Sequence, residues 1–158
     1  MHVVLPHQLF ASHLDADPDT TFVLVEHDLM FRQYRFHTHK LVLHRASMRR
    51  FADRLRERGF DVETIETDGR TSSRAALARV LDDLAPDEVT LHDVVDDWLE
   101  QDLVAALADA GHETDPADWL ETPNFLTTRS QVAEQLGGTG TRMQHFYAWQ
   151  RRRLDVLV

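Results

Sequence analysis

Histidines are the side chains in this sequence best suited to do chemistry, and three of them stand close together. The stretch RFHTHKLVLHRASMRRFADRL, residues 35–55, holds His37, His39 and His44 among a run of arginines. Imidazole binds transition metals and transfers protons near neutral pH, whereas guanidinium groups bind phosphate. The stretch could therefore bind a metal, bind an anion such as nucleic acid, or form an amphipathic helix.

The spacing of these histidines argues against a shared metal ion. On the helix expected over residues 38–58, His37 and His44 are two turns apart, roughly 10 Å along the axis, and His39 lies on the far side. Nitrogen ligands to one zinc ion lie about 2.1 Å from it, so we predict no metal site. The better interpretation is an amphipathic helix that packs one stripe on a sheet. That stripe comprises His37, Leu41, His44, Met48, Phe51, Ala52 and Leu55.

The composition narrows the class of protein. The 158 residues, 42% of them hydrophobic, are enough for one globular domain with a real core. Cysteine is absent, which excludes thiolate zinc sites and iron–sulfur clusters within these residues. There is no apolar run near the roughly 20 residues that span a bilayer, and the N-terminus lacks the cationic start of a signal peptide. We expect a soluble cytoplasmic protein without a membrane partner.

Charge is unusual in amount and in placement. The net charge is −10, and Lys40 is the only lysine beside 16 arginines. Such an acidic, lysine-poor surface suits a high-salt, halophile-like cytoplasm. Residues 29–58 carry nine basic side chains against two acidic ones, whereas residues 61–121 carry three against 18. A globally acidic domain binds DNA poorly, since phosphate contacts supply most of that affinity, so only residues 29–58 could face an anion.

The elements that must position any site alternate between strands and helices. Short β-branched runs predict strands at 2–6, 21–27, 61–67 and 88–94, and helical patterns fall at 38–58, 73–85, 97–110 and 142–157. Residues 125–128 are a late strand or a loop. Serine before the second helix and Gly59 after the first are expected end signals. The order predicts an α/β fold, a Rossmann/flavodoxin-like open, mainly parallel sheet flanked by helices.

Polar side chains follow three of the predicted strands. They are His7, Gln8, Glu26, His27, Asp28, His92 and Asp93. Ligands of open α/β sheets bind beyond the carboxyl ends of the strands, so this edge is the predicted small-ligand site. Glu26 ends an apolar strand, where its carboxylate needs a partner. A ligand could supply it, as could Arg32, Arg35 or helix amides.

Three further features have ordinary structural interpretations. Gly137–Gly140 reads GGTG without a preceding strand, which indicates a flexible linker and not a phosphate-binding loop. Asp96 and Asp97 are expected to cap a helix. Trp98 and Trp119 are expected in the core or in the wall of a pocket.

A longer pattern extends along the chain. The string K-x7-M-R-x-F-A-x2-L-R-x2-G-F-x-V begins at Lys40 and ends at Val62. Further motifs accompany it: Gln8-Leu9, Glu26, Trp98, Phe125-Leu126, and the string RMxxFYxxxRR over residues 142–152. In order and spacing they resemble the photolyase-related proteins, of the bacterial and archaeal cryptochrome/photolyase branch that carries an iron–sulfur cluster. The resemblance covers the whole chain.

The resemblance implies that the functions of the family are divided between two domains. It identifies residues 1–137 as the N-terminal, antenna-type α/β domain, and residues 138–158 as a linker and helix leading toward a missing flavin-binding domain. FAD, the iron–sulfur cluster and contact with damaged DNA are implied only for that domain, and Arg151–Arg153 would lead toward it. Photolyases are carbon–carbon lyases that need the flavin as electron donor. This chain alone is therefore expected to repair no DNA and to bind neither FAD nor iron.

The resemblance also implies a chromophore near the strand ends. Members of that family can bind a light-harvesting lumazine there, so the candidate cofactor-binding residues are His7, Gln8, Glu26, His37, His92 and Asp93. The sequence departs from the family pattern: it has PHQL where GDQL is usual. After Glu26 it has Met30, Gln33 and Phe36-His37 where the family has Glu, Tyr and His-His, retaining His37.

Two alternatives use the same edge of the sheet. The first is a stand-alone small-nucleotide-binding α/β protein of signalling or stress type. The second is a small hydrolase built on His7, His27, His92 and Asp93, with metal ligation by the three histidines as a variant. Solvated loop histidines are the simpler interpretation of these residues.

Overall fold

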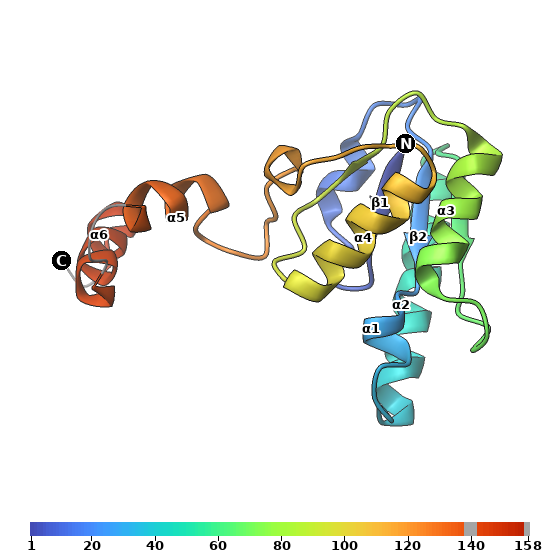
Figure 1. The fold of residues 1–158 in the computed structure, drawn as a ribbon, viewed down its shortest axis with the longest axis horizontal. Helices are drawn as coiled ribbons and strands as arrows, with labels where there is room; N and C mark the ends of the chain where they lie inside the picture. The colour runs from blue at the N-terminus through green and yellow to red at the C-terminus, as the bar shows by residue number, and fades with distance from the viewer. Residues whose placement is uncertain (138–141, 157–158) are drawn as a thin grey trace. The chain divides into compact units, whose positions relative to one another are not determined.

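Four short parallel strands form the central sheet of the computed structural model, which describes residues 1–137 and 142–156 (Figure 1). The strands are β1 (His2–Val4), β2 (Phe22–Val25), β3 (Val62–Ile65) and β4 (Thr90–Leu91), in the order β3-β2-β1-β4. β1 and β2 are entirely buried, as expected for strands covered on both faces. The predicted α/β fold is confirmed, and every pairing between these strands is parallel.

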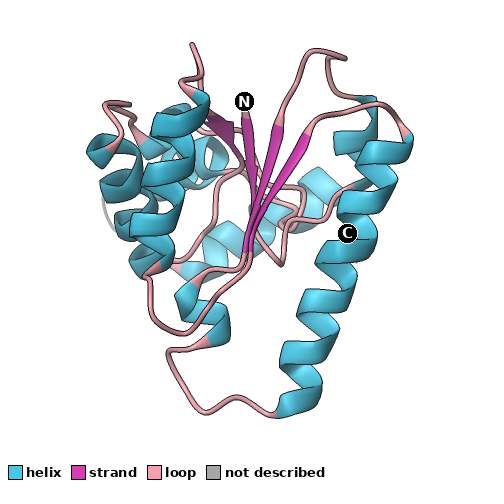
Figure 2. Cartoon of the chain, turned by 90° about the vertical axis from the view of Figure 1, so that its right-hand side faces the viewer, coloured by secondary structure: helices cyan, strands magenta, loops and turns pink. Residues whose placement is uncertain are grey.

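Helices cover both faces of this sheet (Figure 2). The 20-residue helix α2 (Thr38–Glu57) packs on one face, and α3 (Ser73–Leu84) and α4 (Asp97–Asp109) pack on the other. Shorter elements complete the layers: η1 (Ala11–Asp15), α1 (Asp28–Phe31) and η2 (Pro116–Asp118). The chain places β2 and β3 on one side of β1 and β4 on the other, so the topological switch point lies between β1 and β4.

The ends of the helices follow the signals in the sequence. Ser72 caps α3, because its Oγ accepts a hydrogen bond from the amide of Ala75 at 3.2 Å. Asp96 caps α4 in the same way through the amide of Leu99 at 2.9 Å. Gly59 follows α2 with a φ of 93°, a left-handed conformation that glycine adopts without a steric penalty. These predictions are confirmed.

The apolar stripe of α2 is buried along only part of its length. Met48 is 5% exposed and Leu55 is fully buried, whereas Arg49 faces solvent. Leu41 of the stripe is only half-buried, because the first turns of α2 project past the sheet (Figures 1 and 2). Leu43, which lies off the stripe on the same turns, is 69% exposed. The helix therefore anchors to the core through its second half.

The chain divides into two compact units, Met1–Leu120 and Glu121–Val158. The first holds the sheet; the second holds α5 (Arg129–Leu136) and α6 (Met143–Leu154). Residues 125–128 form a loop, and Thr128 begins α5 with a capping box. Past Gly137 the predicted linker lies outside the described residues, and the division at 137/138 stays a prediction.

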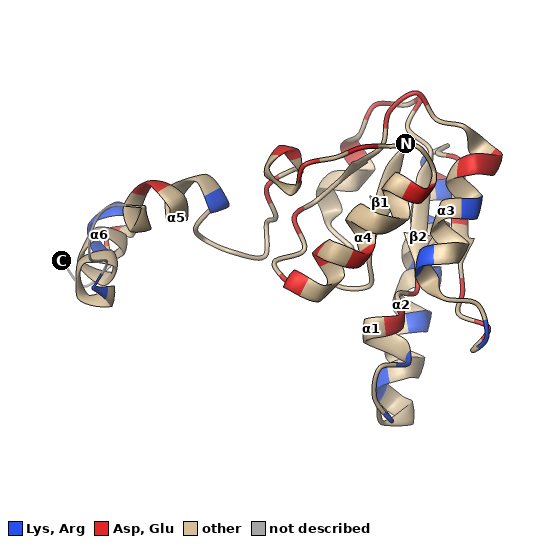
Figure 3. Ribbon diagram, viewed as in Figure 1, with Lys and Arg blue, Asp and Glu red and all other residues tan. Residues whose placement is uncertain are grey.

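Charge is segregated in the fold as it is in the sequence. Basic side chains are concentrated on α2, and acidic ones are spread along α4 (Figure 3). Exposed ion pairs join neighbouring elements, among them Arg49 with Glu66 at 2.7 Å and Arg74 with Asp109 at 2.6 Å. Of the helices in 1–137 and 142–156, none is long and apolar enough to cross a membrane.

Candidate functional site

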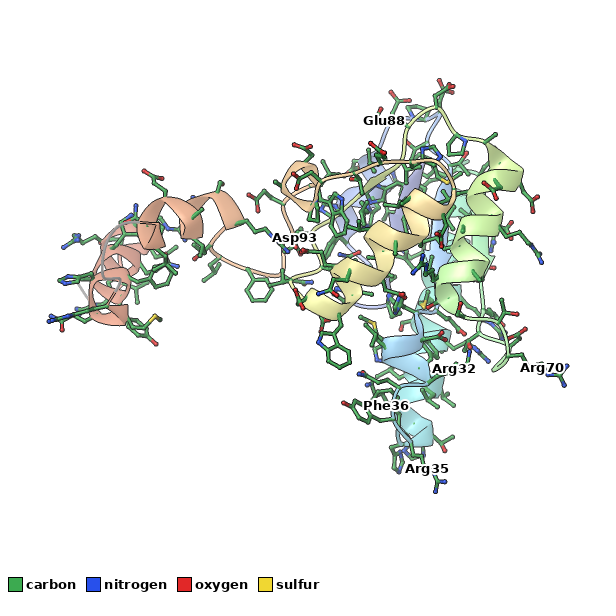
Figure 4. The ribbon with its side chains drawn as sticks, viewed as in Figure 1. Arg32, Arg35, Phe36, Arg70, Glu88 and Asp93 are labelled. Atoms are coloured by element: carbon green, nitrogen blue, oxygen red, sulfur yellow. The ribbon has the colours of Figure 1, made fainter. Side chains whose placement is uncertain are left out.

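Gln8 occupies the switch point between β1 and β4. Its side chain is 1% exposed, and its Nε2 donates to the backbone oxygens of His92 at 3.1 Å and Asp93 at 3.2 Å. Three of the predicted site residues are therefore brought together, and Figure 4 marks Asp93 on this loop. The side-chain amide of Gln8 joins the segment after β1 to the loop after β4 at this point. Its Oε1 is buried and has no hydrogen-bond partner among the groups that the structure describes.

Glu26, directly after β2, is also satisfied by the protein itself. Its side chain is 2% exposed, and it receives two hydrogen bonds from Arg45, one of them from Nε to Oε1 at 2.6 Å. The amide of Thr67 donates to Oε2 at 2.9 Å. Arg32, a partner expected from the sequence, bonds to Asp28 instead. The hydrogen bond to Glu26 raises the pKa of Arg45, and the two side chains form a structural pair.

A cavity of about 250 Å³ lies beside β3 and α3. Ser73 and Asp28 close one side of it, because the amide of Ser73 donates to Asp28 Oδ2 at 3.0 Å and the amide of Asp28 donates to Ser73 Oγ at 3.1 Å. Its acidic lining residues are Glu26, Asp28, Glu63, Glu66 and Asp68. This concentration of carboxylates disfavours a phosphate-bearing ligand in this cavity.

His27 serves as the cap of α1 and is not part of a histidine cluster. Its Nδ1 accepts from the amide of Leu29 at 3.3 Å, so the proton is on Nε2, which donates to Asp102 at 2.8 Å. Burial lowers the pKa of His27, and this effect outweighs the opposing influence of Asp102. The side chain is therefore neutral at pH 7. The structure does not bring it together with His92 as the hydrolase alternative requires.

The remaining predicted residues lie apart from one another. His7 is half-buried, and burial lowers its pKa, with Asp96 raising it and His44 lowering it further. His37 is exposed and caps α2, where its Nδ1 accepts from the amide of His39 at 3.2 Å. Figure 4 shows the neighbouring Phe36 well away from Asp93. A binding role for the six predicted residues stays a prediction.

A second hollow, of about 330 Å³, lies where α1 and α4 begin, at the carboxyl edge of the sheet. It is lined by Leu29, Met30, Gln33, Tyr34, Asp96, Trp98 and Leu99. Its volume is near the lower end of the roughly 300–1,000 Å³ of small-molecule sites. Trp98, expected in a pocket wall, lines it and is 67% exposed; Tyr34 is 66% exposed. Two aromatic faces are thus available to a planar ligand.

Sequence reasoning missed Tyr34 and the true neighbours of His92. Tyr34 carried a usable signal, since it is an aromatic residue in a charged loop that follows a strand end. His92 lies beside His2 and His13, with ring centroids 5.4 and 5.3 Å away respectively. No local motif marks this group, because its members come from three separate segments of the chain.

Known proteins are similar to this chain along nearly its whole length. A family model described as "Deoxyribodipyrimidine photo-lyase-related protein" matches residues 2–158. An uncharacterized protein of Acanthamoeba polyphaga mimivirus is 31% identical over 168 residues, which cover 99% of this chain and 83% of that relative. The match to the family spans both compact units. The chain therefore belongs to the deoxyribodipyrimidine photo-lyase-related protein family.

Proposed function

We propose that this chain supplies the antenna-type domain of a photolyase-related protein of the iron–sulfur branch, and that its Met1–Leu120 unit binds a lumazine-class heterocycle. The observation that carries the proposal is the hollow of about 330 Å³ at the carboxyl edge of the sheet. The exposed rings of Tyr34 and Trp98 give a planar ligand two surfaces for stacking. Gln33 and Asp96 offer polar groups to its edge.

The side chains that line the hollow replace some of the hydrogen-bonding groups that are lost where this sequence departs from the family pattern. Met30 and Gln33 stand where a carboxylate and a phenol are usual, and both line the hollow. Tyr34, one position later, restores a phenol to the same wall. Met30 and Leu99 provide an apolar floor, as is usual for heterocycle sites. The acidic cavity beside β3 lacks such aromatic groups among its lining residues.

We propose further that this chain is a scaffold without catalytic activity of its own. A thiolate-bound cluster has no ligands in a sequence without cysteine. In the described parts of α5 and α6 no side chain is buried, while Phe125, Leu126, Met143 and Tyr147 are each more than half exposed. Apolar side chains exposed together favour a partner surface. The partner proposed is the flavin-binding domain, through which alone DNA would be reached.

The test is a binding titration with a matched substitution. The purified chain is titrated with 6,7-dimethyl-8-ribityllumazine, ATP and FAD by calorimetry. The lumazine should bind, and Trp98→Ala should weaken it by about 1–3 kcal/mol, the usual contribution of stacking on an aromatic side chain. Trp149→Ala, which removes a tryptophan from the other unit, should leave the affinity unchanged.

Other outcomes would redirect the assignment. Binding of ATP without the lumazine would favour the nucleotide-binding alternative. Stoichiometric binding of FAD would contradict a non-catalytic antenna domain. Equal losses in Trp98→Ala and Trp149→Ala, with both proteins folded, would move the site away from the hollow.

A further inference from the structure

Three histidines that are distant in the sequence converge on the α2 side of the sheet. His2 begins β1, His13 lies in η1, and His92 follows β4. Their ring centroids are 4.9 Å apart for His2 and His13, 5.4 Å for His2 and His92, and 5.3 Å for His13 and His92. One ring nitrogen from each lies within 4.8 Å of one from each of the others.

The polar contacts of His2 are made by its Nδ1. This atom lies 2.8 Å from Thr90 Oγ1, and the same hydroxyl lies 3.2 Å from the backbone oxygen of Met1, which only accepts. When the one hydroxyl proton is donated to Met1, Nδ1–H is the donor to Thr90 and Nε2 keeps its lone pair. His2 Nε2 is buried without a hydrogen-bond partner within the described structure. His2 as a whole is 6% exposed.

His13 is oriented by the same kind of contact. Its Nε2 lies 2.9 Å from the backbone oxygen of Gln8. A carbonyl oxygen only accepts, so Nε2 carries the proton and Nδ1 is a lone pair. Histidines that bind metals typically donate their second ring N–H to a carbonyl or another acceptor, which fixes the tautomer and the ring orientation. His13 has this arrangement before any ion is bound, and so does His2 in the tautomer that is protonated at Nδ1.

The surroundings favour neutral ligands in a dry site. Burial, together with His13 and His92, lowers the pKa of His2 to about 3, and burial lowers the pKa of His13. Both rings are therefore unprotonated at pH 7, as ligands must be. Phe22 and Phe10 pack against the group, with centroids 5.7 Å from His2 and 5.2 Å from His92. An apolar shell of this kind restricts the access of water.

We propose that His2, His13 and His92 together bind one divalent transition-metal ion of the zinc type, with a fourth position open to water or another ligand. Zinc–nitrogen bonds of about 2.0–2.1 Å imply nitrogen separations of about 3.4 Å in a tetrahedral site. The ring nitrogens, which now lie within 4.8 Å of one another, must therefore approach by up to about 1.4 Å. The ion would join β1, η1 and the loop after β4. The proposal is independent of the lumazine site.

The experiment uses the untagged full chain after removal of metals with a chelator. Co²⁺ is added as a spectroscopic probe, and Zn²⁺ is then added as competitor. One equivalent of Co²⁺ should give the intense visible bands of a tetrahedral site, Zn²⁺ should abolish them, and Mg²⁺ should not. His92→Gln should weaken Co²⁺ binding by more than about 100-fold. This exceeds the roughly 10–100-fold loss of metal affinity that is typical when a residue hydrogen-bonded to a ligand is replaced. His37→Gln, at an exposed histidine, should have no effect.

Each alternative outcome contradicts the proposal. Absence of binding by the folded wild-type chain would show that the three rings only stack as neutral aromatic groups. Binding that survives in His92→Gln, or that is lost in His37→Gln, would place the ion elsewhere. Because His92 is half-buried, its substitution is the least disruptive of the three. Should that variant fail to fold, the wild type still decides: saturating Zn²⁺ must raise its melting temperature, and no shift would overturn the site.

Discussion

At the scale of single residues, buried polar side chains are held by partners from distant segments. Glu26 is bound by Arg45 of α2, and Gln8 by the backbone after β4. The sequence pattern correctly indicated that Glu26 ends a strand. From this position we expected its carboxylate to need a hydrogen-bond partner. It could not name Arg45, because the crossing of α2 over β2 decides which arginine reaches the carboxylate.

The histidine cluster shows the same limit. The rule that sites gather at the carboxyl ends of strands directed attention to His7, His27 and His92. His2 lies at the opposite end of its strand. It comes close to His92 because the register pairs His2 with Thr90, which precedes His92 by two residues. The helix η1 then places His13 beside both rings. Strand register and the path of a loop are not encoded in any local pattern. The expectation of no metal therefore weighed the histidines of residues 37–44 and those that follow the strands, but neither His2 nor His13.

Arg45→Met tests whether Glu26 is a structural ion pair. Loss of the guanidinium leaves a carboxylate that is 2% exposed and that, among the described residues, keeps the amide of Thr67 as its partner. We expect the free energy of unfolding to fall by about 2 kcal/mol in denaturant titrations. This is less than the roughly 3–5 kcal/mol of a fully buried pair, because 38% of the Arg45 side chain is exposed. Arg49→Met, which breaks an exposed pair, should have a smaller effect, and equal effects would refute this interpretation.

His27→Asn tests the neutral buried histidine through the pH dependence of stability. The pKa of His27 is lowered from 6.5 in the folded chain, so below pH 6.5 the unfolded chain binds a proton that the folded chain does not. The free energy of unfolding therefore falls as the pH drops from 6.5. Asparagine preserves the helix cap and removes the titration, so the wild-type advantage over the variant should shrink with falling pH. His39→Asn is the exposed control, and parallel pH profiles for the wild type and His27→Asn would be inconsistent with the assignment.

At the scale of elements, the periodicity of apolar residues predicted the strands and helices that pack in the core. It missed the short elements that depend on local hydrogen bonds. The four strands and the core-packed helices α2, α3 and α4 lie where the apolar patterns indicated. The helix α6 was also predicted, although no described side chain in it is buried. The four-residue helix α1 is too short to have a period; it depends on the side-chain cap of His27 and on the reciprocal bonds of Asp28 with Ser73. The first turns of α2 have the periodic pattern but no sheet beneath them.

Two substitutions on α2 should separate its buried half from its exposed half. Met48→Ala removes a side chain that is 5% exposed and packs with Phe51 and Leu55, and it should lower the free energy of unfolding by about 2–5 kcal/mol. Leu43→Ala, on the projecting end, should change it by no more than about 0.5 kcal/mol. Chemical denaturation measures both. Comparable losses would show that the projecting end is packed in solution.

At the scale of the whole molecule, one sheet-bearing unit carries two candidate sites in separate parts of its fold. The hollow between α1 and α4 has exposed aromatic rings and suits a heterocycle. The histidine group lies on the face that carries α2 and is enclosed by phenylalanines. The fold class followed from the sequence, and so did membership of the family. The residues that line the hollow could not be predicted from the sequence, because they depend on how the segment around α1 is placed relative to the start of α4.

The measurement that tests the antenna proposal most directly is a crystal structure of the chain with 6,7-dimethyl-8-ribityllumazine bound. The account predicts that the ring lies in the hollow, stacked against Trp98 or Tyr34 with its polar edge toward Gln33 and Asp96. It predicts an empty acidic cavity beside β3 and an unbroken pair between Glu26 and Arg45. A ring bound in that cavity, or one that displaces Arg45 from Glu26, would contradict it.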